Sequence, residues 1–174
     1  MKLLAFAASS SSKSINKQLA TYAASLVSDA TVEILDINDY EMPIFSQDRE
    51  EELGQPEAAK AFYAKLGQAD AIIISFAEHN GSYTAAYKNL FDWTSRIDMK
   101  LFQNKPMVLL ATSPGPGGAK TVLAAATGSA PYFAADVRSS ISVPSFFDNF
   151  DSEKQVITNP AIIDEIKSAL SFLA

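Results

Sequence analysis

The sequence predicts an α/β domain in which helices cover both faces of an open, five-stranded parallel sheet. Short apolar runs alternate with segments of helical periodicity along the chain. Most of these runs lack the polar–apolar alternation of a strand with one face in water, so we expect the strands to be buried on both faces. The length of 174 residues is that of an ordinary single domain, and residues 1–174 are expected to form one.

The first half of the chain alternates between strands and helices. A continuous apolar run predicts a strand at Lys2–Ala8, and apolar residues at helical spacing predict a helix at Ser14–Ser28. The β-branched, alternating segment Thr31–Ile37 is expected to be the second strand. Asn38–Gln55 contains helix breakers and an acidic run, so we expect an irregular, solvated segment. A proline in the first turn marks the helix predicted at Pro56–Leu66.

The second half continues the alternation. The strongest strand signal is Asp70–Phe76, which is short and almost wholly apolar, and a helix is predicted at Tyr83–Ile97. Another apolar strand is expected at Pro106–Thr112. A helix opens at Ala119–Ala126, with room to continue to Ala135. A strand and a helix close the chain, at Val137–Val143 and Pro160–Leu173. Because crossovers are right-handed, two strand orders are common for such a sheet.

The composition excludes several classes of function. The chain has no cysteine and one histidine, which excludes a disulfide, a thiolate metal site, a cysteine nucleophile and a multi-histidine metal site within one chain. The net charge is −6, and the basic residues are scattered singly, so we expect neither nucleic acid nor a membrane as a partner. The apolar run near the N-terminus is shorter than a secretory signal core, so a cytoplasmic protein is expected.

Three turns that lead from a strand into a helix have unusual compositions, and ligands of open α/β sheets bind outside the carboxyl ends of the strands. The first turn, the serine loop (residues 8–16), has four consecutive serines followed by Lys13 and Ser14. Hydroxyl groups and the free N–H groups of a helix start can enclose a phosphate dianion. The alternative is a helix start with more capping residues than it needs. The spacing fits neither a dinucleotide fingerprint nor a P-loop.

The other two turns are rich in residues that shape the backbone. The Asn-Gly loop (residues 77–83) contains Asn80-Gly81, which favours positive φ and exposes N–H groups that suit a flat heterocycle; the alternative is a plain turn capped by Ser82 or Thr84. The Gly-Pro loop (residues 112–119) has three glycines and two prolines, so a ligand can approach its backbone closely. A phosphate on the serine loop and a flat ring between the other two loops match the shape of flavin mononucleotide (FMN).

The residues of these loops also follow the motifs of a known family. The motif G-S-x-R-x-x-S-x-N is matched at Ser9, Ser14 and Asn16. The motif P-E-Y-N-G-S-x-P-A-x-L-K-N-x-x-D-W is matched at Glu78, Asn80, Gly81, Ser82, Ala85, Lys88, Asn89, Asp92 and Trp93. The motif S-P-G-x-x-G-G is similar at Ser113, Pro114, Gly115 and Gly118. Over residues 2–145 the sequence therefore resembles the NADPH-dependent FMN reductase family, which includes quinone and chromate reductases.

This resemblance implies a fold and an activity. It implies a flavodoxin-like, doubly wound domain with strand order 2-1-3-4-5. It implies an oxidoreductase that passes hydride from NADPH or NADH to FMN and then two electrons to a quinone, a free flavin or a similar acceptor. Because the flavin carries the chemistry, no catalytic acid–base pair is expected. The alternatives are an FMN-binding electron carrier or redox sensor that oxidises no nicotinamide, and a domain that has lost FMN.

The resemblance also implies which residues bind FMN and that the chain forms a homo-oligomer, a dimer or a tetramer. Ser11 stands in place of the family's motif arginine, and His79, a modulator of the flavin by its position, stands in place of the motif tyrosine. Trp93 lies off the apolar stripe of its helix and is expected to pack on a partner. The expected cofactor-binding residues are Ser9, Ser11, Lys13, Ser14, Ile15, Asn16, Ala77, Glu78, His79, Asn80, Gly81, Ser113, Pro114, Gly115 and Gly118.

Overall fold

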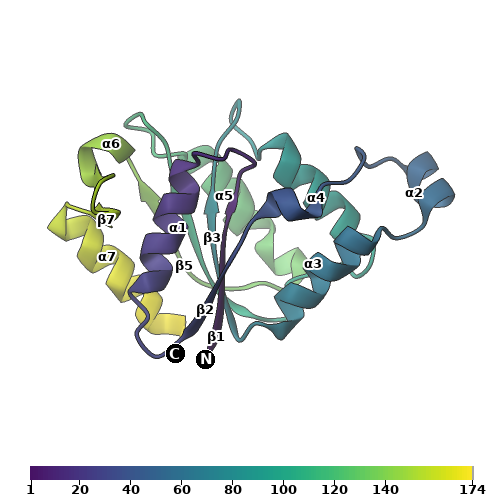
Figure 1. Ribbon diagram of the computed structural model, residues 1–174, viewed down its shortest axis with the longest axis horizontal. Coiled ribbons are helices and arrows are strands. Elements are labelled where there is room, and N and C mark those ends of the chain that lie inside the picture. The colour runs from purple at the N-terminus through teal and green to yellow at the C-terminus, as the bar shows by residue number, and fades with distance from the viewer. Residues whose placement is uncertain (174) are drawn as a thin grey trace.

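The computed structural model of the protein describes residues 1–173, and its centre is a parallel sheet of five strands (Figure 1). The strand order is β2-β1-β3-β4-β5, so the predicted fold class and order are confirmed. All pairings in this sheet are parallel. The strands are β1 (Lys2–Ala8), β2 (Thr31–Leu35), β3 (Ala71–Phe76), β4 (Pro106–Thr112) and β5 (Asp136–Val143). Ala174, the last residue of the predicted domain, lies outside the described residues.

Helices cover both faces of this sheet. One face is covered by α1 (Ile15–Ser25) and α7 (Pro160–Leu170), which Figure 1 shows side by side. The other face is covered by α3 (Glu57–Gln68), α4 (Ala85–Ser95) and α5 (Lys120–Ser129). Short 3-10 turns follow β2, α5 and α7, at η1 (Ile37–Tyr40), η2 (Ala130–Phe133) and η3 (Ser171–Leu173). The domain is therefore a three-layer sandwich, as continuous burial of the strands requires.

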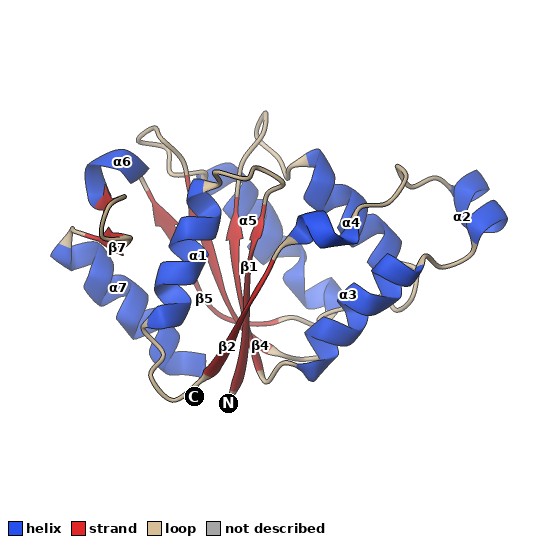
Figure 2. Cartoon of the chain, viewed as in Figure 1, coloured by secondary structure: helices blue, strands red, loops and turns tan. Residues whose placement is uncertain are grey.

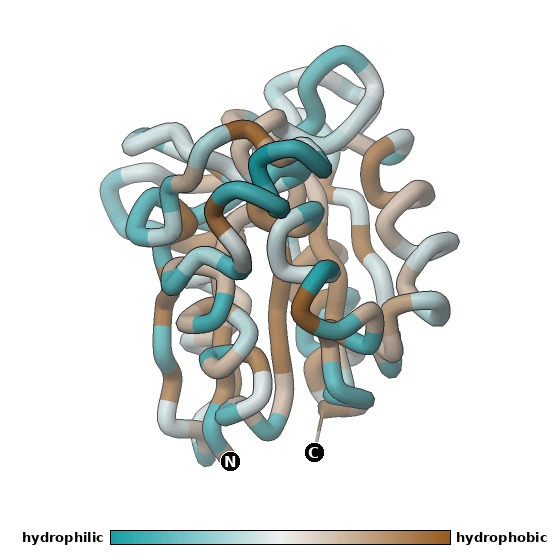
Figure 3. Tube along the Cα trace, turned by 90° about the vertical axis from the view of Figure 1, so that its right-hand side faces the viewer, coloured by the Kyte–Doolittle hydropathy of each residue, from teal (hydrophilic) through white to brown (hydrophobic). Residues whose placement is uncertain are grey.

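The core explains why the central strands read as unbroken apolar runs. β3 is buried along its whole length, and its odd and even residues enter different cores. Ile72 and Ile74 pack beneath α3 and α4, whereas Ile73 packs beneath α1. In Figure 3 the brown, hydrophobic stretches run along the strands in the interior. β2 lies at one edge of the sheet, where Val32 and Ile34 remain exposed, so it lacks the two-sided burial of the central strands.

Four short elements lie in segments where no regular structure was predicted. Helix α2 (Gln47–Leu53) lies within the segment expected to be irregular and has no buried residue, so it has no apolar periodicity to detect. Figure 2 shows that α2 extends away from the rest of the chain. After β5 the chain forms α6 (Phe146–Asn149) and a hairpin of β6 (Phe150–Asp151) and β7 (Val156–Ile157). These elements are too short for a sequence pattern to form.

Trp93 lies inside its own chain, and the expectation that it packs on a partner was wrong. Its side chain is 0% exposed, and its indole N–H donates to the carbonyl oxygen of Pro43 at 2.7 Å. Its ring meets Phe45 edge-to-face, with the centroids 5.1 Å apart. The segment after β2 therefore covers the second apolar face of α4. No helix among residues 1–173 is long and apolar enough to cross a membrane.

Candidate functional site

The carboxyl end of the sheet brings the three unusual loops together around one cleft. The loops project from the upper edge of the sheet in Figure 2. The cleft between them has a volume of about 300 Å³. It is lined by Ser9, Ser11, Lys13, Ser14, Ile15, Asn16, Ala77, Glu78, His79, Thr112, Ser113 and Pro114. Three segments that lie far apart in the sequence thus form one continuous wall, as the strand order places them next to each other.

The serine loop presents hydrogen-bond donors at the start of α1. Ser14 is the N-cap, and its Oγ accepts from the backbone N–H of Lys17 at 3.1 Å. The side chain is only 7% exposed, and within residues 1–173 its hydroxyl hydrogen has no acceptor. In the same described range the N–H groups of Ile15 and Asn16 donate to no protein acceptor, as is usual in a first helical turn. These donors are suited to an anion.

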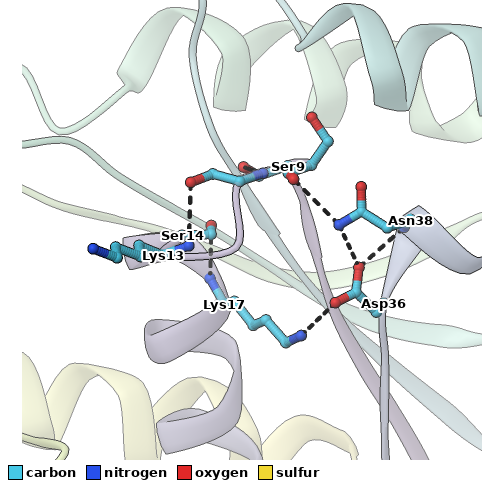
Figure 4. A network of polar contacts seen from close by, with 8 residues as sticks. Ser9, Lys13, Ser14, Lys17, Asp36 and Asn38 are labelled. Atoms are coloured by element: carbon cyan, nitrogen blue, oxygen red, sulfur yellow. Dashed lines mark hydrogen bonds and ion pairs between the residues drawn. The ribbon is translucent and has the colours of Figure 1, made fainter.

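A network of polar contacts holds the serine loop from the side of β2 (Figure 4). The Asn38 side-chain amide donates to the carbonyl oxygen of Ser10 and to Asp36. Asp36 in turn pairs with Lys17 at 2.6 Å. Because Lys17 is neutralised within this pair, its charge is not available to a ligand. Lys13 points away from the pair in Figure 4 and lines the cleft, so it supplies the positive charge there.

The network predicts a small pH dependence of stability. The hydrogen bond from Lys17, and then the N–H of Asn38, hold the pKa of Asp36 below its ordinary value. A lowered pKa stabilises the fold above the unfolded value of about 3.9, and this stabilisation is lost as the pH falls through the folded pKa. We expect Asp36→Asn, which keeps the cap of η1, to lower the free energy of unfolding by about 0.5 kcal/mol near neutral pH. The effect is small because both side chains of the pair are more than one third exposed and water screens their charges.

Urea unfolding of both proteins at about pH 7 and about pH 3 measures this difference. The difference should shrink at the lower pH, because that pH lies below the unfolded pKa of about 3.9, where the stabilisation from a lowered folded pKa is being lost. An equal difference at both values would show that the Lys17–Asp36 pair contributes nothing through its charge.

Asn16 lines the cleft, but its side chain makes its hydrogen bonds to groups inside the protein. This corrects the expectation that the side chain binds the phosphate. Its Oδ1 accepts from Ser75 Oγ at 2.7 Å and from the Thr112 N–H at 3.1 Å. Its Nδ2 donates to the Thr112 carbonyl oxygen at 3.2 Å. Thr112 then donates through Oγ1 to the carbonyl oxygen of Val143. One buried side chain therefore joins α1 to β3 and β4 beneath the cleft, and only its backbone N–H remains for an anion.

The Asn-Gly loop is a tight hairpin whose tip lies outside the cleft. His79 and Ser82 exchange backbone hydrogen bonds, at 3.0 and 3.1 Å. Asn80 and Gly81 between them have φ values of 53° and 75°, as a two-residue hairpin turn requires, so the predicted positive φ is confirmed. Of this loop, Ala77, Glu78 and His79 line the cleft and the tip does not, and the contact of Asn80 and Gly81 with a ring stays a prediction. His79 itself is exposed at the rim.

Two side chains anchor the ends of this loop. Thr84 donates to the carbonyl oxygen of Ala8 at 3.1 Å and caps α4 by accepting from the Tyr87 N–H. This hydroxyl stands where the resembled motif has proline, and it joins the loop to β1. At the other end Glu78 accepts from the backbone N–H of Val122 in α5 at 2.9 Å. Beneath the loop, Phe76, Tyr83 and Tyr87 pack as aromatic neighbours.

Hydrogen bonds from β5 and the residues just after it hold the Gly-Pro loop in place. The N–H of Ser145 donates to the carbonyl oxygen of Gly115, and the N–H of Phe146 donates to that of Ser113. Ser142 Oγ donates to the carbonyl oxygen of Gly118 at 2.7 Å. Gly118 has a φ of 58°, and a Cβ there would lie 2.3 Å from Ser142 Oγ. Gly115 and Gly118 therefore shape the loop without lining the cleft, and their direct contact with a ligand stays a prediction.

The second half of the long motif has a structural role. Asn89 accepts from the N–H of Phe45 at 2.8 Å and donates to the carbonyl oxygens of Met42 and Pro43. Lys88 pairs with Asp92 one turn further along α4. Asn89 therefore holds the segment after β2 against α4, whereas the Lys88–Asp92 pair stays within the helix.

Thr112 is a lining residue that was not among the predicted site residues. It is the last residue of β4 and the first of the Gly-Pro loop, and its residue type alone gives no reason to select it as a site residue. Its place in the site depends on Asn16, which lies 96 residues away in the chain. Among residues 1–173 no group of three or more His, Asp or Glu side chains is placed to hold a metal ion.

The comparisons with known proteins agree with this geometry. Residues 1–148 match the family described as NADPH-dependent FMN reductase. A 2-hydroxy-1,4-benzoquinone reductase of Burkholderia sp is 38% identical over 104 residues, which are 59% of this chain and 55% of that protein. An NAD(P)H-dependent FMN reductase of Pseudomonas aeruginosa is 32% identical over 116 residues, 66% of this chain and 61% of that protein. The matched part thus spans little more than half of these relatives.

A solved structure confirms the fold. The flavoenzyme NAD(P)H:(acceptor) oxidoreductase FerB of Paracoccus denitrificans superposes with a TM-score of 0.76 and 20% identity, covering 99% of this chain and 94% of that one. At this identity the likeness concerns the fold alone. The sequence match over residues 1–148, with the three loops at one cleft, establishes the family: the chain belongs to the NADPH-dependent FMN reductases.

Proposed function

We propose that the protein binds FMN in the cleft between the three loops and uses it to pass electrons from NADPH or NADH to a quinone, a free flavin or a similar small acceptor. The observation that carries this proposal is the composition of the cleft wall. Hydroxyl and N–H donors gather on the serine loop, and residues of the Asn-Gly and Gly-Pro loops form the rest of the wall. Family membership supports the same cofactor.

The donor set fits the phosphate group of FMN. Ser9, Ser11 and Ser14 supply hydroxyls, and the first turn of α1 supplies unpaired N–H groups and the positive end of its dipole. The hydroxyl hydrogen of Ser14 is buried and free to donate. Lys13 provides a positive charge in place of the motif arginine, whose position Ser11 occupies. These features favour an FMN-binding domain over one that has lost the cofactor.

The flat ring would lie between the Asn-Gly and Gly-Pro loops. Ala77 and Glu78 of the first loop and Ser113 and Pro114 of the second line the cleft. Within residues 1–173 the N–H of Glu78 donates to no protein acceptor, so it is free for a ring carbonyl. Such donors stabilise negative charge that grows on a ring during reduction. When bound, FMN supplies the hydride acceptor and the electron donor, and the chain's own residues orient it.

Anaerobic mixing of the FMN-loaded protein with NADPH tests this function. We expect prompt bleaching of the visible flavin absorbance, followed by its return when a quinone is added. NADH in a parallel experiment shows which nicotinamide is preferred. An electron carrier or redox sensor would keep its colour with both nicotinamides, and a domain that has lost FMN would bind none.

Replacing Ser14 with alanine is expected to distinguish the contribution of the phosphate to FMN binding from that of the ring. A hydrogen bond to a charged group contributes about 1.5–3 kcal/mol, so the Kd for FMN should rise roughly ten- to a hundredfold. Riboflavin, which lacks the phosphate, should lose much less. Fluorescence titration with both ligands measures the two changes. Because the substitution also removes a helix cap, Ser46→Ala, which removes the cap of α2 far from the cleft, is the control. Equal losses for FMN and riboflavin would contradict the assignment.

His79 is expected to modulate the flavin, because it is exposed at the rim of the ring side of the cleft. A side chain that can carry a positive charge beside the ring favours an anionic reduced flavin. The flavin potential should therefore be higher in the parent protein than in His79→Phe at the same pH. Equal potentials of the two proteins in potentiometric titrations would assign His79 no electrostatic role.

We also propose that the protein is a homo-oligomer, most simply a dimer, that acts in the cytoplasm as a single FMN-binding domain. With Trp93 buried in its own chain, the support for association comes from α2 and its flanks. Helix α2 has no buried residue; its last residue, Leu53, is 52% exposed, and Ile44, which precedes the helix, is 64% exposed. Light scattering should give a multiple of 18.7 kDa, and the monomer mass across micromolar concentrations would refute association.

A further inference from the structure

One side chain fastens the Asn-Gly loop to the helix that follows the Gly-Pro loop. Glu78 Oε2 accepts from the backbone N–H of Val122 at 2.9 Å, across 44 residues of sequence. Val122 is the third residue of α5, where N–H groups lack partners within the helix. The N-cap residue of this helix, Ala119, has a φ of 57° and makes no side-chain cap. The first turn of α5 contains no acidic residue of its own.

This bond links the Asn-Gly loop to the helix that begins where the Gly-Pro loop ends. Both loops line the cleft, through residues 77–79 and residues 112–114. The Gly-Pro loop is held from the other side by Ser142, Ser145 and Phe146 of the β5 side. Within residues 1–173, Glu78 is the residue of the Asn-Gly loop whose side chain bonds to α5. This carboxylate therefore ties the Asn-Gly loop to the helix at the end of the Gly-Pro loop.

We infer that Glu78 is a positioning residue for the flavin ring. By joining the Asn-Gly loop to α5, it sets the spacing of the Asn-Gly and Gly-Pro loops. The inference rests on the proposed function and deepens it. Glu78 would act through the backbone of the two elements that it joins. The bond requires, at position 78, a side chain as long as that of glutamate that ends in an acceptor. A carboxylate at a helix start also interacts with the helix dipole, so a simple capping effect has to be distinguished from positioning.

Thr121 offers this distinction. It is exposed in the first turn of α5, next to Val122 in sequence. An aspartate there places a negative charge at the same helix start but makes no link to the Asn-Gly loop. Thr121→Asp combined with Glu78→Ala therefore restores the stabilisation of the helix and leaves the two loops unjoined.

The experiment compares Glu78→Ala, Glu78→Gln and the Glu78→Ala/Thr121→Asp double variant. Thermal unfolding is measured without FMN, and the Kd for FMN is measured by fluorescence. Glu78→Ala should lower Tm by about 2–4 °C and raise the Kd roughly tenfold. Glu78→Gln keeps an acceptor oxygen of the same reach and should retain most of both properties. The double variant should regain the Tm and keep the weakened Kd.

Two results would overturn the inference. One is a Kd for FMN of Glu78→Ala that equals that of the parent protein. The other is recovery of FMN binding by the double variant, which would show that Glu78 acts only as a helix cap. If Glu78→Ala does not fold, Glu78→Asp, which shortens the side chain by one methylene, takes its place with the same expectations. Absence of FMN binding by the parent protein would instead refute the proposed function, so the two failures are distinguishable.

Discussion

Replacing Gly118 with alanine should destabilise the protein by about 3 kcal/mol or more, because strain and a clash act together. Gly118 has a φ of 58°, in the left-handed region that side chains with a Cβ disfavour. The new Cβ would lie 2.3 Å from Ser142 Oγ and 3.1 Å from the backbone nitrogen of Pro144. Ser142 can rotate only by giving up its hydrogen bond to Gly118, and the proline backbone cannot move independently of β5.

Gly117→Ala is the matched control for this prediction. A Cβ added at this neighbouring glycine would meet nothing within 4 Å, and its φ is not positive. Urea unfolding should therefore show a change of a few tenths of a kcal/mol for Gly117→Ala and a large one for Gly118→Ala. We also expect the Kd for FMN to rise only in the latter, since the Gly-Pro loop must shift. Similar changes in both variants would show that the loop is looser than its hydrogen bonds indicate.

Asn16→Ala should have a second large effect, a loss of about 3 kcal/mol of stability. The substitution leaves the N–H and the carbonyl group of Thr112 and the hydroxyl of Ser75 without their partner. Thr112 and Ser75 are 1% and 0% exposed, so water cannot replace the bonds without opening the structure. Because Asn16 joins α1 to β3 and β4, the floor of the cleft would loosen as well.

Asn38→Ala provides the comparison for this variant. Asn38 also makes side-chain hydrogen bonds, to Ser10 and Asp36, but it is exposed, and water can satisfy the groups it leaves. Its replacement should cost about 1 kcal/mol or less in urea unfolding. If Asn16→Ala were no more destabilising than Asn38→Ala, the buried junction would not hold the carboxyl ends of the strands together.

The parts of the fold that follow from local pattern could be predicted from the sequence. Each central strand is a continuous apolar run, because both of its faces enter a core, and each covering helix has a recognisable apolar stripe. Helix α2 could not be found in this way, since every one of its residues is at least partly exposed. The β6–β7 hairpin has strands of two residues, which is too short for a periodic signal.

The location of the site could be predicted from the sequence, because it follows from the topology of the sheet. Strand-to-helix turns of a parallel sheet gather at one edge, so unusual turns identify cleft residues such as Ser14 and Glu78 without knowledge of contacts. The direction of individual side chains was not predictable. Asn16 turns inward because Ser75 and Thr112 offer it partners, and the tip of the Asn-Gly loop leaves the cleft because Asn80 and Gly81 form a hairpin turn. Trp93 turns toward a segment that no local pattern places beside it.

The central claim, that this cleft binds FMN with its phosphate on the serine loop, is tested most directly by NMR of the labelled apoprotein titrated with FMN and with riboflavin. We expect FMN to shift the amide resonances of residues 9–16, 77–79 and 113. Riboflavin should shift residues 77–79 and 113 but leave the serine loop nearly unchanged. Shifts from FMN that fall outside the cleft, or equal shifts of residues 9–16 by both ligands, would contradict the account.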